Sequence, residues 1–296
     1  MSIPALNPTD AQVQRLRELV YDRTGIWYTD SKLYLLGTRA AAHMADLQVE
    51  GFEAYMRALT VNIGAEAAFR GLCDRVTINE TSFFRDRRQL GVFENHELKK
   101  LIMSRSGTRR LRFWSAASST GEEPYTLAMI LRRQLGAQLS RWNIEVLGTD
   151  LSEDALKTAR EGVYSSYAVR SLDAAQRDEF FTKAEGGRFV LDPSIRKMVR
   201  FEHQNLADPA GMARRGVWDV IFCRNVLIYF DDESRAACFQ CFRSLIAPDG
   251  SLFLGHSESM SSRTDYSPLG EPGGFAWTPH PSSTSNPHPA ERNHVA

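Results

Sequence analysis

The sequence predicts an α/β protein in which a doubly wound domain with a small antiparallel β insertion follows an all-helical N-terminal domain. Two patterns in the 296-residue chain lead to this fold class. Up to about residue 75, apolar residues recur only at helical spacing. From residue 109, short apolar segments alternate with helical ones. That alternation is typical of a parallel sheet covered by helices on both faces.

The helical domain is expected at residues 1–76. Asp10 is expected to cap a first helix that Gly25 ends, because apolar residues between them lie three or four positions apart. Three more helices are expected from Asp30 or Ser31 to Met44, from Phe52 to Leu59 and from Glu66 to Val76. No segment of this region alternates as a strand does, so we expect a small bundle. Residues 77–108 are interpreted as a linker.

The second domain is expected at residues 109–277. Its predicted strands are short and apolar, and they span Leu111–Trp114, Ile144–Leu147, Met198–Phe201, Trp218–Cys223 and Ser251–Leu254. The predicted helices between them are Tyr125–Leu135, a helix capped by Ser152 and closed by Gly162, and Glu233–Ile246. Helices thus separate successive strands, which favours parallel pairing.

An inserted β-subdomain is predicted at about residues 165–200. Its hairpin is expected to pair Arg188–Leu191 with Ile195–Val199 across the turn-forming dipeptide Asp192-Pro193. Residues 278–296 are rich in Pro, Ser, Asn and His, and we expect them to form a disordered tail.

Composition narrows the function classes. Lys and Arg number 36 and so do Asp and Glu, and a net charge of zero argues against a protein that coats nucleic acid or an anionic membrane. No apolar run approaches the ~18 residues of a membrane span, and no secretory signal is visible. Cys238 and Cys241 are expected to pack in a helix rather than bind zinc, because no second pair exists. We therefore expect a cytoplasmic protein without a metal. We also expect it to be a monomer.

Residues at three predicted strand ends suit a ligand, since open α/β sheets bind ligands beyond the carboxyl ends of their strands. A turn of small residues, Ser115–Gly121, follows the first strand and precedes Glu122 and Glu123. Asp150 ends the second strand, where a carboxylate can accept hydrogen bonds from ribose, and Arg224-Asn225 end the fourth. A dinucleotide fold would carry Gly-x-Gly-x-x-Gly here, and the two acids would repel a pyrophosphate. The pattern favours adenosine without phosphates, as in S-adenosylmethionine.

Four longer motifs carry a resemblance to a known family. They are NETSFFRD at 79–86, WSAASSTGEEPY at 114–125, FCRNVLIYF at 222–230 and GHSE at 255–258. In this order they resemble the chemotaxis receptor glutamate O-methyltransferases of the CheR type, over roughly residues 10–277. The resemblance implies a Rossmann-like methyltransferase domain, S-adenosylmethionine as cofactor and S-adenosylhomocysteine as product. It implies methyl-accepting chemotaxis receptors, through their cytoplasmic helical bundle, as partners.

The resemblance also assigns residues. It places cofactor contacts at Asn79, Thr81, Arg85, Glu123, Asp150, Asn205, Leu206, Arg224 and Asn225. It places Tyr229 in the active site, where we expect Tyr229 and Arg85 to be the catalytic residues by positioning the reactants. Glu122 adjoins Glu123, and the sequence leaves open which one contacts the cofactor. A glutamate with a pKa near ~4.3 is already ionised at neutral pH, so the reaction needs alignment rather than a base.

Other polar or aromatic groups have structural alternatives. His256–Glu258 is expected to form a structural turn rather than a catalytic group, and Phe83 and Phe84 fit a linker core as well as a ligand contact. One helix face carries Lys32, Arg39 and His43. This face is either solvated or, as the resemblance implies, contacts the acidic receptor bundle.

Two other functions stay open at this stage. One is a methyltransferase of the same fold that acts on another protein or a small molecule, and the other is a non-catalytic S-adenosylmethionine-binding signalling module. Some members of the resembled family hold a receptor C-terminal peptide on the edge of the β-subdomain. Here the preceding stretch, Phe181–Arg188, is short, so we expect the edge strand near Phe189–Leu191 not to take an added peptide strand.

Overall fold

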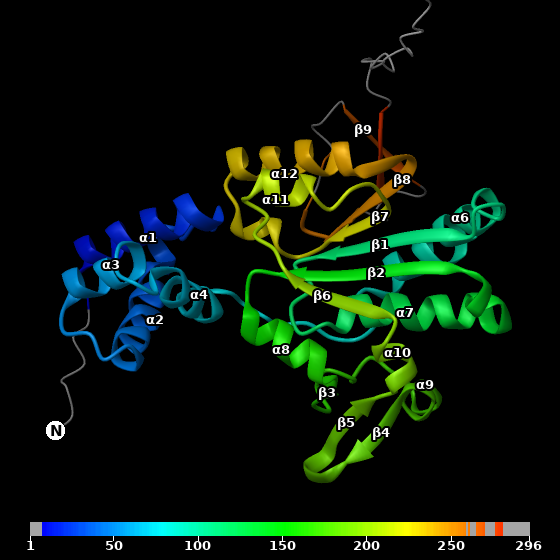
Figure 1. Cartoon of the computed structure of the whole chain (residues 1–296), viewed down its shortest axis with the longest axis horizontal. Helices are drawn as coiled ribbons and strands as arrows, with labels where there is room; N and C mark the ends of the chain where they lie inside the picture. The colour runs from blue at the N-terminus through cyan, green and yellow to red at the C-terminus, as the bar shows by residue number, and fades with distance from the viewer. Residues whose placement is uncertain (1–7, 259, 261–264, 270–275, 281–296) are drawn as a thin grey trace, which may run out of the picture.

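A computed structural model describes residues 8–258, 260, 265–269 and 276–280. Figure 1 shows a helical domain at the blue end of the chain, a central sheet covered by helices, and a small separate sheet below it. The carboxyl ends of the central strands face the helical domain. These parts confirm the predicted fold class. In the described part of the chain, no helix has both the length and the apolar character that crossing a bilayer requires.

Four helices form the N-terminal domain: α1 Asp10–Thr24, α2 Leu33–Asp46 with a 3-10 turn at Asp30–Lys32 before it, α3 Phe52–Thr60 and α4 Ala65–Val76. The cap of α1 differs from the prediction. Thr9 is the N-cap and forms a capping box with Gln12, whereas Asp10 is the first helical residue. There the Asp10 carboxylate still suits the positive end of the helix dipole.

The predicted face of Lys32, Arg39 and His43 does not exist as one surface. His43 is 3% exposed and its Nδ1 lies 2.9 Å from the Tyr55 hydroxyl. Burial lowers the pKa of His43 to about 4, so the imidazole is neutral. Arg39 donates to the Tyr28 hydroxyl at 2.8 Å, and of the three residues only Lys32 is exposed.

The second half of the predicted linker is a layer of the α/β domain. It contains α5 Arg87–Val92, a π-helical turn at Phe93–Glu97 and α6 Leu98–Ser104. The ring of Phe93 meets Phe113, Phe222 and Phe253 edge-on, at centroid distances of 5.2 to 5.9 Å. Aromatic packing therefore fixes this segment on the sheet.

The central sheet has the strand order β6-β2-β1-β7-β8-β10-β9. Its strands are β1 Arg110–Ala116, β2 Asn143–Asp150, β6 Val199–His203, β7 Trp218–Cys223, β8 Ile246–Leu254, β9 Tyr266–Leu269 and β10 Ala276–Pro279. The first five in this order pair in parallel, whereas β10 and β9 are antiparallel. The sequence did not predict β9 and β10. Thr278 and Pro279, which it assigned to the tail, belong to β10, and residues 281–296 of the predicted tail lie outside the described residues.

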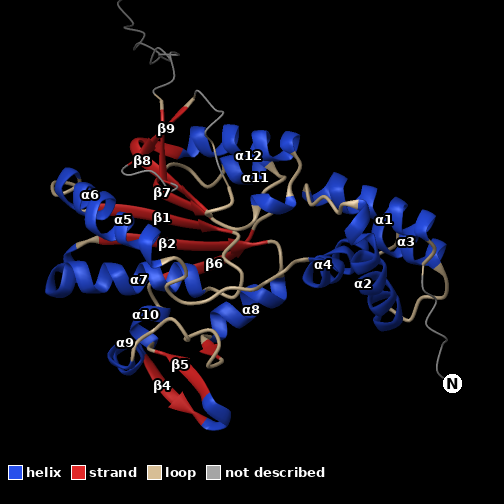
Figure 2. Ribbon diagram, turned by 180° about the vertical axis from the view of Figure 1, so that it is seen from behind, coloured by secondary structure: helices blue, strands red, loops and turns tan. Residues whose placement is uncertain are grey.

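Helices cover both faces of this sheet, as Figure 2 shows. They are α7 Glu122–Leu135, a 3-10 turn at Gly136–Arg141, α8 Glu153–Glu161, α11 Pro209–Ala213 and α12 Asp232–Leu245. One buried core joins α6 and α7 to the sheet and the other joins α12 to its opposite face. Because β1 has β2 on one side and β7 on the other, the chain reverses direction of winding next to β1. Such a switch point forms a crevice at the carboxyl ends.

The inserted subdomain is built differently from the prediction. Its sheet has the order β3-β5-β4, with β3 Val163–Tyr164, β4 Phe181–Ala184 and β5 Arg188–Leu191, flanked by α9 Ala174–Phe180 and α10 Pro193–Arg196. Thus β5 pairs with β4 across the turn at 185–187, not with Ile195–Val199. The Asp192 carboxylate caps α10 instead of forming a hairpin turn. The edge strands are therefore β3, with two residues, and β4, with four, whereas the predicted edge strand β5 is central.

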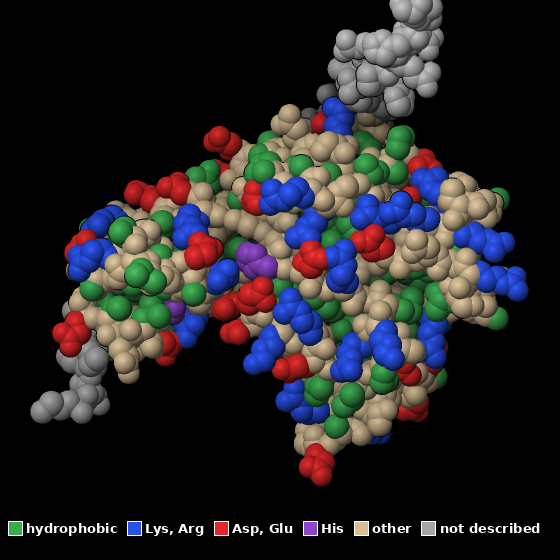
Figure 3. Space-filling model, in the orientation of Figure 1, with side chains coloured by type: hydrophobic (Ala, Val, Ile, Leu, Met, Phe, Trp, Pro, Cys, Tyr) green, Lys and Arg blue, Asp and Glu red, His purple; other side chains and the backbone are tan. Residues whose placement is uncertain are grey.

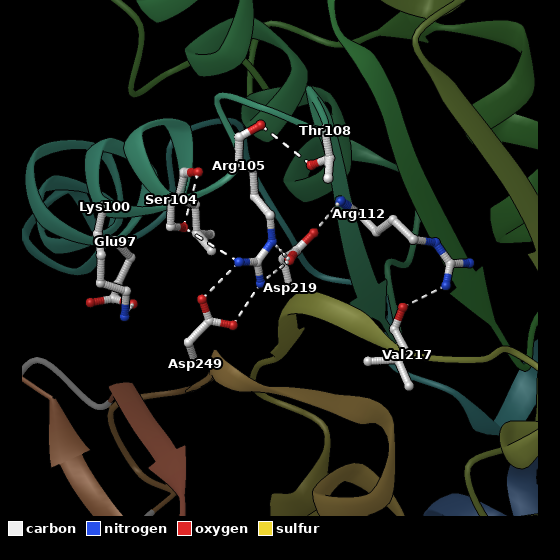
Figure 4. A network of polar contacts seen from close by, with 10 residues as sticks. Glu97, Lys100, Ser104, Arg105, Thr108, Arg112, Val217, Asp219 and Asp249 are labelled. Carbon is white, nitrogen blue, oxygen red and sulfur yellow. Dashed lines mark hydrogen bonds and ion pairs between the residues drawn. The ribbon is translucent and has the colours of Figure 1, made fainter. Parts of the chain in front are cut away.

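An ion-pair network holds the amino end of the sheet together (Figure 4). Arg105, just after α6, donates to both carboxylate oxygens of Asp249 at 2.6 and 2.8 Å and to Asp219 at 3.2 Å. The second Asp219 oxygen accepts from the backbone N–H of Arg112 at 2.8 Å. The network thereby connects the end of α6 with β1, β7 and β8.

Candidate functional site

A cavity lies where the carboxyl ends of β1, β2 and β7 meet the helical domain. Its walls come from the strand-end loops, from the segment 76–85 and from residues 24–39 of the helical domain. The structure brings to this one cavity every residue that the sequence assigned to the cofactor or the active site, namely Asn79, Thr81, Arg85, Glu123, Asp150, Asn205, Leu206, Arg224, Asn225 and Tyr229. What each of them contacts remains a prediction.

Asp150 ends β2 and is 6% exposed. One carboxylate oxygen accepts from the backbone N–H of Ser119 at 2.8 Å and the other from that of Ser152 at 2.9 Å. Burial raises the pKa of Asp150, while these two N–H groups lower it. Each oxygen keeps a lone pair for a further donor, because a carboxylate has about four acceptor sites.

Arg224 follows β7 and forms a buried ion pair with Glu123. Its Nη1 donates to Glu123 Oε2 at 2.9 Å, and its Nη2 donates to the carbonyl oxygen of Arg85 at 2.9 Å. Ser115 Oγ donates to the other Glu123 oxygen at 2.7 Å. The pair joins the ends of β1 and β7 to the linker motif, and it places Glu123 in the cavity wall.

Glu122 turns away from the cavity. Its carboxylate accepts from Thr120 Oγ1 at 2.7 Å, and only 3% of the residue is exposed. Burial raises the pKa of Glu122 to about 7. The structure therefore separates the two adjacent acids into Glu123 in the cavity lining and Glu122 beneath it.

Glu258 shapes the loop that carries Asn225 and Tyr229. Its side chain accepts four backbone N–H groups, from Gly255 at 2.7 Å, Asn225 at 2.8 Å, Val226 at 2.9 Å and Leu227 at 2.7 Å. Only 4% of Glu258 is exposed. A Cβ at Gly255 would lie 2.7 Å from the Glu258 carboxylate, so only glycine fits beside it. Glu258 is thus the centre of the turn that the sequence predicted for His256–Glu258.

The loop after β7 also contacts the helical domain directly. The backbone carbonyl oxygen of Tyr229, at the end of the 3-10 turn Leu227–Tyr229, accepts a hydrogen bond from the backbone N–H of Trp27 at 2.8 Å, and Phe230 forms a β-bridge with Ile26. Burial raises the pKa of Tyr229, so its phenol is protonated near neutral pH and can donate a hydrogen bond. The helical domain therefore forms one wall of the cavity.

Strained backbone gathers around the cavity. Five of the seven non-glycine residues with positive φ in the described chain lie in its loops: Phe84, Asp86, Ala117, Ser119 and Asn225. Positive φ costs such residues of order 1 kcal/mol or more, and it concentrates at functional sites. Two buried polar atoms of the lining, Ser118 Oγ and Arg224 Nε, have no partner among the described residues. Both observations fit a polar ligand in this cavity.

Sequence reasoning missed two contributors. Glu258 was weighed only as part of a turn, although an acid four residues after a buried strand is a signal for a loop-closing carboxylate. Trp27, Tyr28 and Arg39 form the far wall of the cavity, and no local pattern connects them with a strand end some 200 positions away.

Comparison with known proteins gives one family. Residues 79–271 match the family described as "CheR methyltransferase, SAM binding domain", and residues 11–77 match "CheR methyltransferase, all-alpha domain". A Vibrio cholerae protein named chemotaxis protein methyltransferase 2 is 35% identical over 86% of this chain and 87% of its own length. The chemotaxis protein methyltransferase of Escherichia coli is 33% identical over 86% of both chains. That of Salmonella typhimurium is 32% identical over 86% of this chain and 85% of its own.

Proposed function

The chain belongs to the CheR methyltransferase family, and from that premise we propose that it methylates glutamate side chains of methyl-accepting chemotaxis receptors. Its membership makes it an S-adenosylmethionine-dependent methyltransferase of chemotaxis. The proposal adds the acceptor, a glutamate carboxylate that becomes a methyl ester, and a cytoplasmic monomer acting on the receptor's helical bundle.

One observation carries the choice of an anionic acceptor. Lys32 and Arg85 line the cavity, and neither pairs with a carboxylate among the described residues. The Arg85 side chain donates to the carbonyl oxygen of Glu80 at 3.0 Å. Glu123, by contrast, is neutralised by Arg224. The cavity thus offers unpaired positive charge, which suits the carboxylates of a glutamate substrate and of an amino-acid cofactor.

The residues present fit S-adenosylmethionine. Asp150 has free lone pairs for ribose hydroxyls, and Asn205 and Leu206 line the same side of the cavity for the adenine. Arg85, Asn79 and Thr81 of the linker motif would hold the amino-acid end. When bound, the cofactor supplies a methyl group on a sulfonium, a good leaving group.

The residues of the chain would contribute by aligning the acceptor carboxylate with the methyl group. A glutamate carboxylate is ionised near neutral pH, so no residue has to remove a proton. Arg85 and the Tyr229 phenol would orient the acceptor, and Glu258 and the Arg224–Glu123 pair would hold their loops in place. Most of the rate enhancement would then come from proximity and orientation.

Labelled methyl transfer to receptor-rich membranes tests this function. We expect base-labile label that is released as methanol, and Arg85→Ala should reduce transfer at least about tenfold, because one charge-assisted contact is lost. The matched control is Arg110→Ala, an exposed arginine at the opposite end of β1, which should leave transfer unchanged.

Three results would contradict the proposal. Base-stable label would indicate N-methylation of another acceptor. Transfer only to small molecules would indicate a different methyltransferase of the same fold. Cofactor binding without any transfer would indicate a sensor.

A further inference from the structure

A second cavity lies beside the first, at the seam between the helical and α/β domains. In Figure 3, basic and acidic side chains and a histidine border the seam where the two domains meet. The helical side of the cavity comes from α1 and α4, and the other side from the end of β6 and from α11. Its charged lining consists of Arg23, Arg70, Arg214 and Arg215 against Glu66 and Asp208. The lining therefore has an excess of two positive charges.

Two of the four guanidinium groups already form ion pairs with carboxylates. Arg23 pairs with Glu66 and lies 3.7 Å over the Phe69 ring, and Arg215 pairs with Glu202. These contacts make both arginines fixed parts of the wall.

The other two guanidinium groups are free. The side chains of Arg70 on α4 and of Arg214, just after α11, have no hydrogen bond or ion pair with any described residue. They come from opposite domains and line the same cavity. His203 lines the same cavity, and its buried Nε2 also has no partner among the described residues. Asp208 is occupied as the N-cap of α11, where it accepts from Gly211.

We propose that this seam cavity binds a phosphate-bearing small molecule between Arg70, Arg214 and His203. Guanidinium groups match phosphate oxygens bidentately, and a buried imidazole nitrogen adds a third polar contact. A multivalent anion satisfies both free arginines at once, which a single carboxylate does less well because it has one charge and two oxygens.

Binding there should favour cofactor binding, and this half of the inference rests on the proposed function. Leu151, Gln204 and Asn205 line both cavities. The Asn205 side chain donates to the carbonyl oxygen of Arg23 at 2.5 Å, and Arg215 donates to Gln204 at 3.0 Å. An anion that bridges α4 and α11 would hold the helical wall against these shared residues. By linkage, it then raises the affinity of the first cavity.

Calorimetric titration of the full chain with pyrophosphate, without cofactor and at constant ionic strength, tests the site. We expect binding by the wild type that weakens at least about tenfold in Arg70→Gln/Arg214→Gln, since two charged contacts are lost. Arg110→Gln, which removes an exposed arginine at the far end of β1, should bind as the wild type does. A parallel titration with ribose 5-phosphate distinguishes a phosphate monoester from a free diphosphate as the preferred ligand.

The outcomes separate the two halves of the inference. No pyrophosphate binding at millimolar concentration, or equal binding by the double variant, overturns the site. Saturating pyrophosphate should strengthen S-adenosylhomocysteine binding several-fold in the wild type and not in the double variant. Unchanged affinity overturns the coupling, and a chain that binds pyrophosphate but no S-adenosylhomocysteine would instead contradict the proposed function.

Discussion

The two ends of the central sheet use charged residues in opposite ways. At the amino end, Arg105 is matched on both sides by Asp219 and Asp249, and the network fastens one helix to three strands (Figure 4). At the carboxyl end, within the part of the chain that the structure describes, Arg224 keeps an unpartnered Nε and Arg85 has no carboxylate partner. Strained loops surround that end. Complete pairing stabilises a fold, whereas incomplete pairing leaves polar groups available to a ligand.

Glu258→Ala tests whether the carboxyl end has its own structural support. The substitution leaves four buried or part-buried N–H groups without an acceptor, so we expect a loss of about 3–5 kcal/mol in the free energy of unfolding. Methyl transfer per folded molecule should also fall strongly, because the loop that carries Asn225 and Tyr229 loses its shape. Urea unfolding followed by circular dichroism, with transfer assayed below the transition, measures both.

The matched variant at the amino end is Asp219→Ala. It removes a buried acceptor of Arg105 and of the Arg112 backbone, and we expect a comparable loss of stability with unchanged transfer per folded molecule. If Asp219→Ala impaired transfer as much as Glu258→Ala does, the assignment of stability to the amino end and of ligand binding to the carboxyl end would be wrong.

Glu122 gives the carboxyl end of the sheet a pH-dependent contribution to stability. Burial raises the pKa of Glu122 from 4.5 to about 7. Between these values the folded chain holds a proton that the unfolded chain has lost, so stability falls as the pH rises from about 4.5 to about 7. The total loss should be about 3 kcal/mol. Glu122→Gln removes this pH dependence, because glutamine does not titrate. We therefore expect the variant to become more stable relative to the wild type as the pH rises across that range.

Two groups provide controls for that experiment. His43, whose pKa burial lowers to about 4, contributes stability that is lost as the pH falls, but it does so equally in both proteins and cancels in the difference. Asp249 at the amino end has its pKa lowered by its hydrogen bond with Arg105. Asp249→Asn should therefore destabilise the chain at neutral pH, and its effect should vanish as Asp249 becomes protonated. A flat difference for Glu122→Gln would mean that this carboxyl is ionised throughout.

Asp150→Asn probes the ligand side of the same end. The amide keeps an acceptor for one backbone N–H but loses the charge that would receive ribose hydroxyls. We expect the affinity for S-adenosylhomocysteine to fall by about 1.5–3 kcal/mol, with less effect on the unfolding of the free chain. Isothermal titration calorimetry measures it, and unaltered affinity would remove Asp150 from the cofactor site.

The sequence predicted those parts that short-range chemistry decides. Ser152 and Gly162 cap and close α8 as expected, and β7 has the expected bounds, because caps and buried strands are local patterns. The partner of β5 was wrong, since Asp192-Pro193 suits both a turn and the start of a helix, and only the pairing with β4 decides between them. Adjacent positions such as Glu122 and Glu123 point about 100° apart on a helix, and tertiary packing alone selects the one that faces the cavity.

We expect the smallest effect on methyl transfer from changes at the β-subdomain. The longer of its two edge strands is β4, which has four residues and ends in a three-residue turn. Only alternate residues of an edge strand turn their N–H and C=O groups outward, so an added peptide gains about four hydrogen bonds at roughly 1 kcal/mol each. That total corresponds to a dissociation constant of about 1 mM, before the entropy cost of ordering the peptide is subtracted. We therefore expect a receptor that lacks its C-terminal peptide to be methylated as fast as the complete receptor. Titration of such a peptide into the chain checks this, with Lys183→Pro on β4 as the matched variant. Low-micromolar binding that this proline abolishes would show that the short edge suffices for docking.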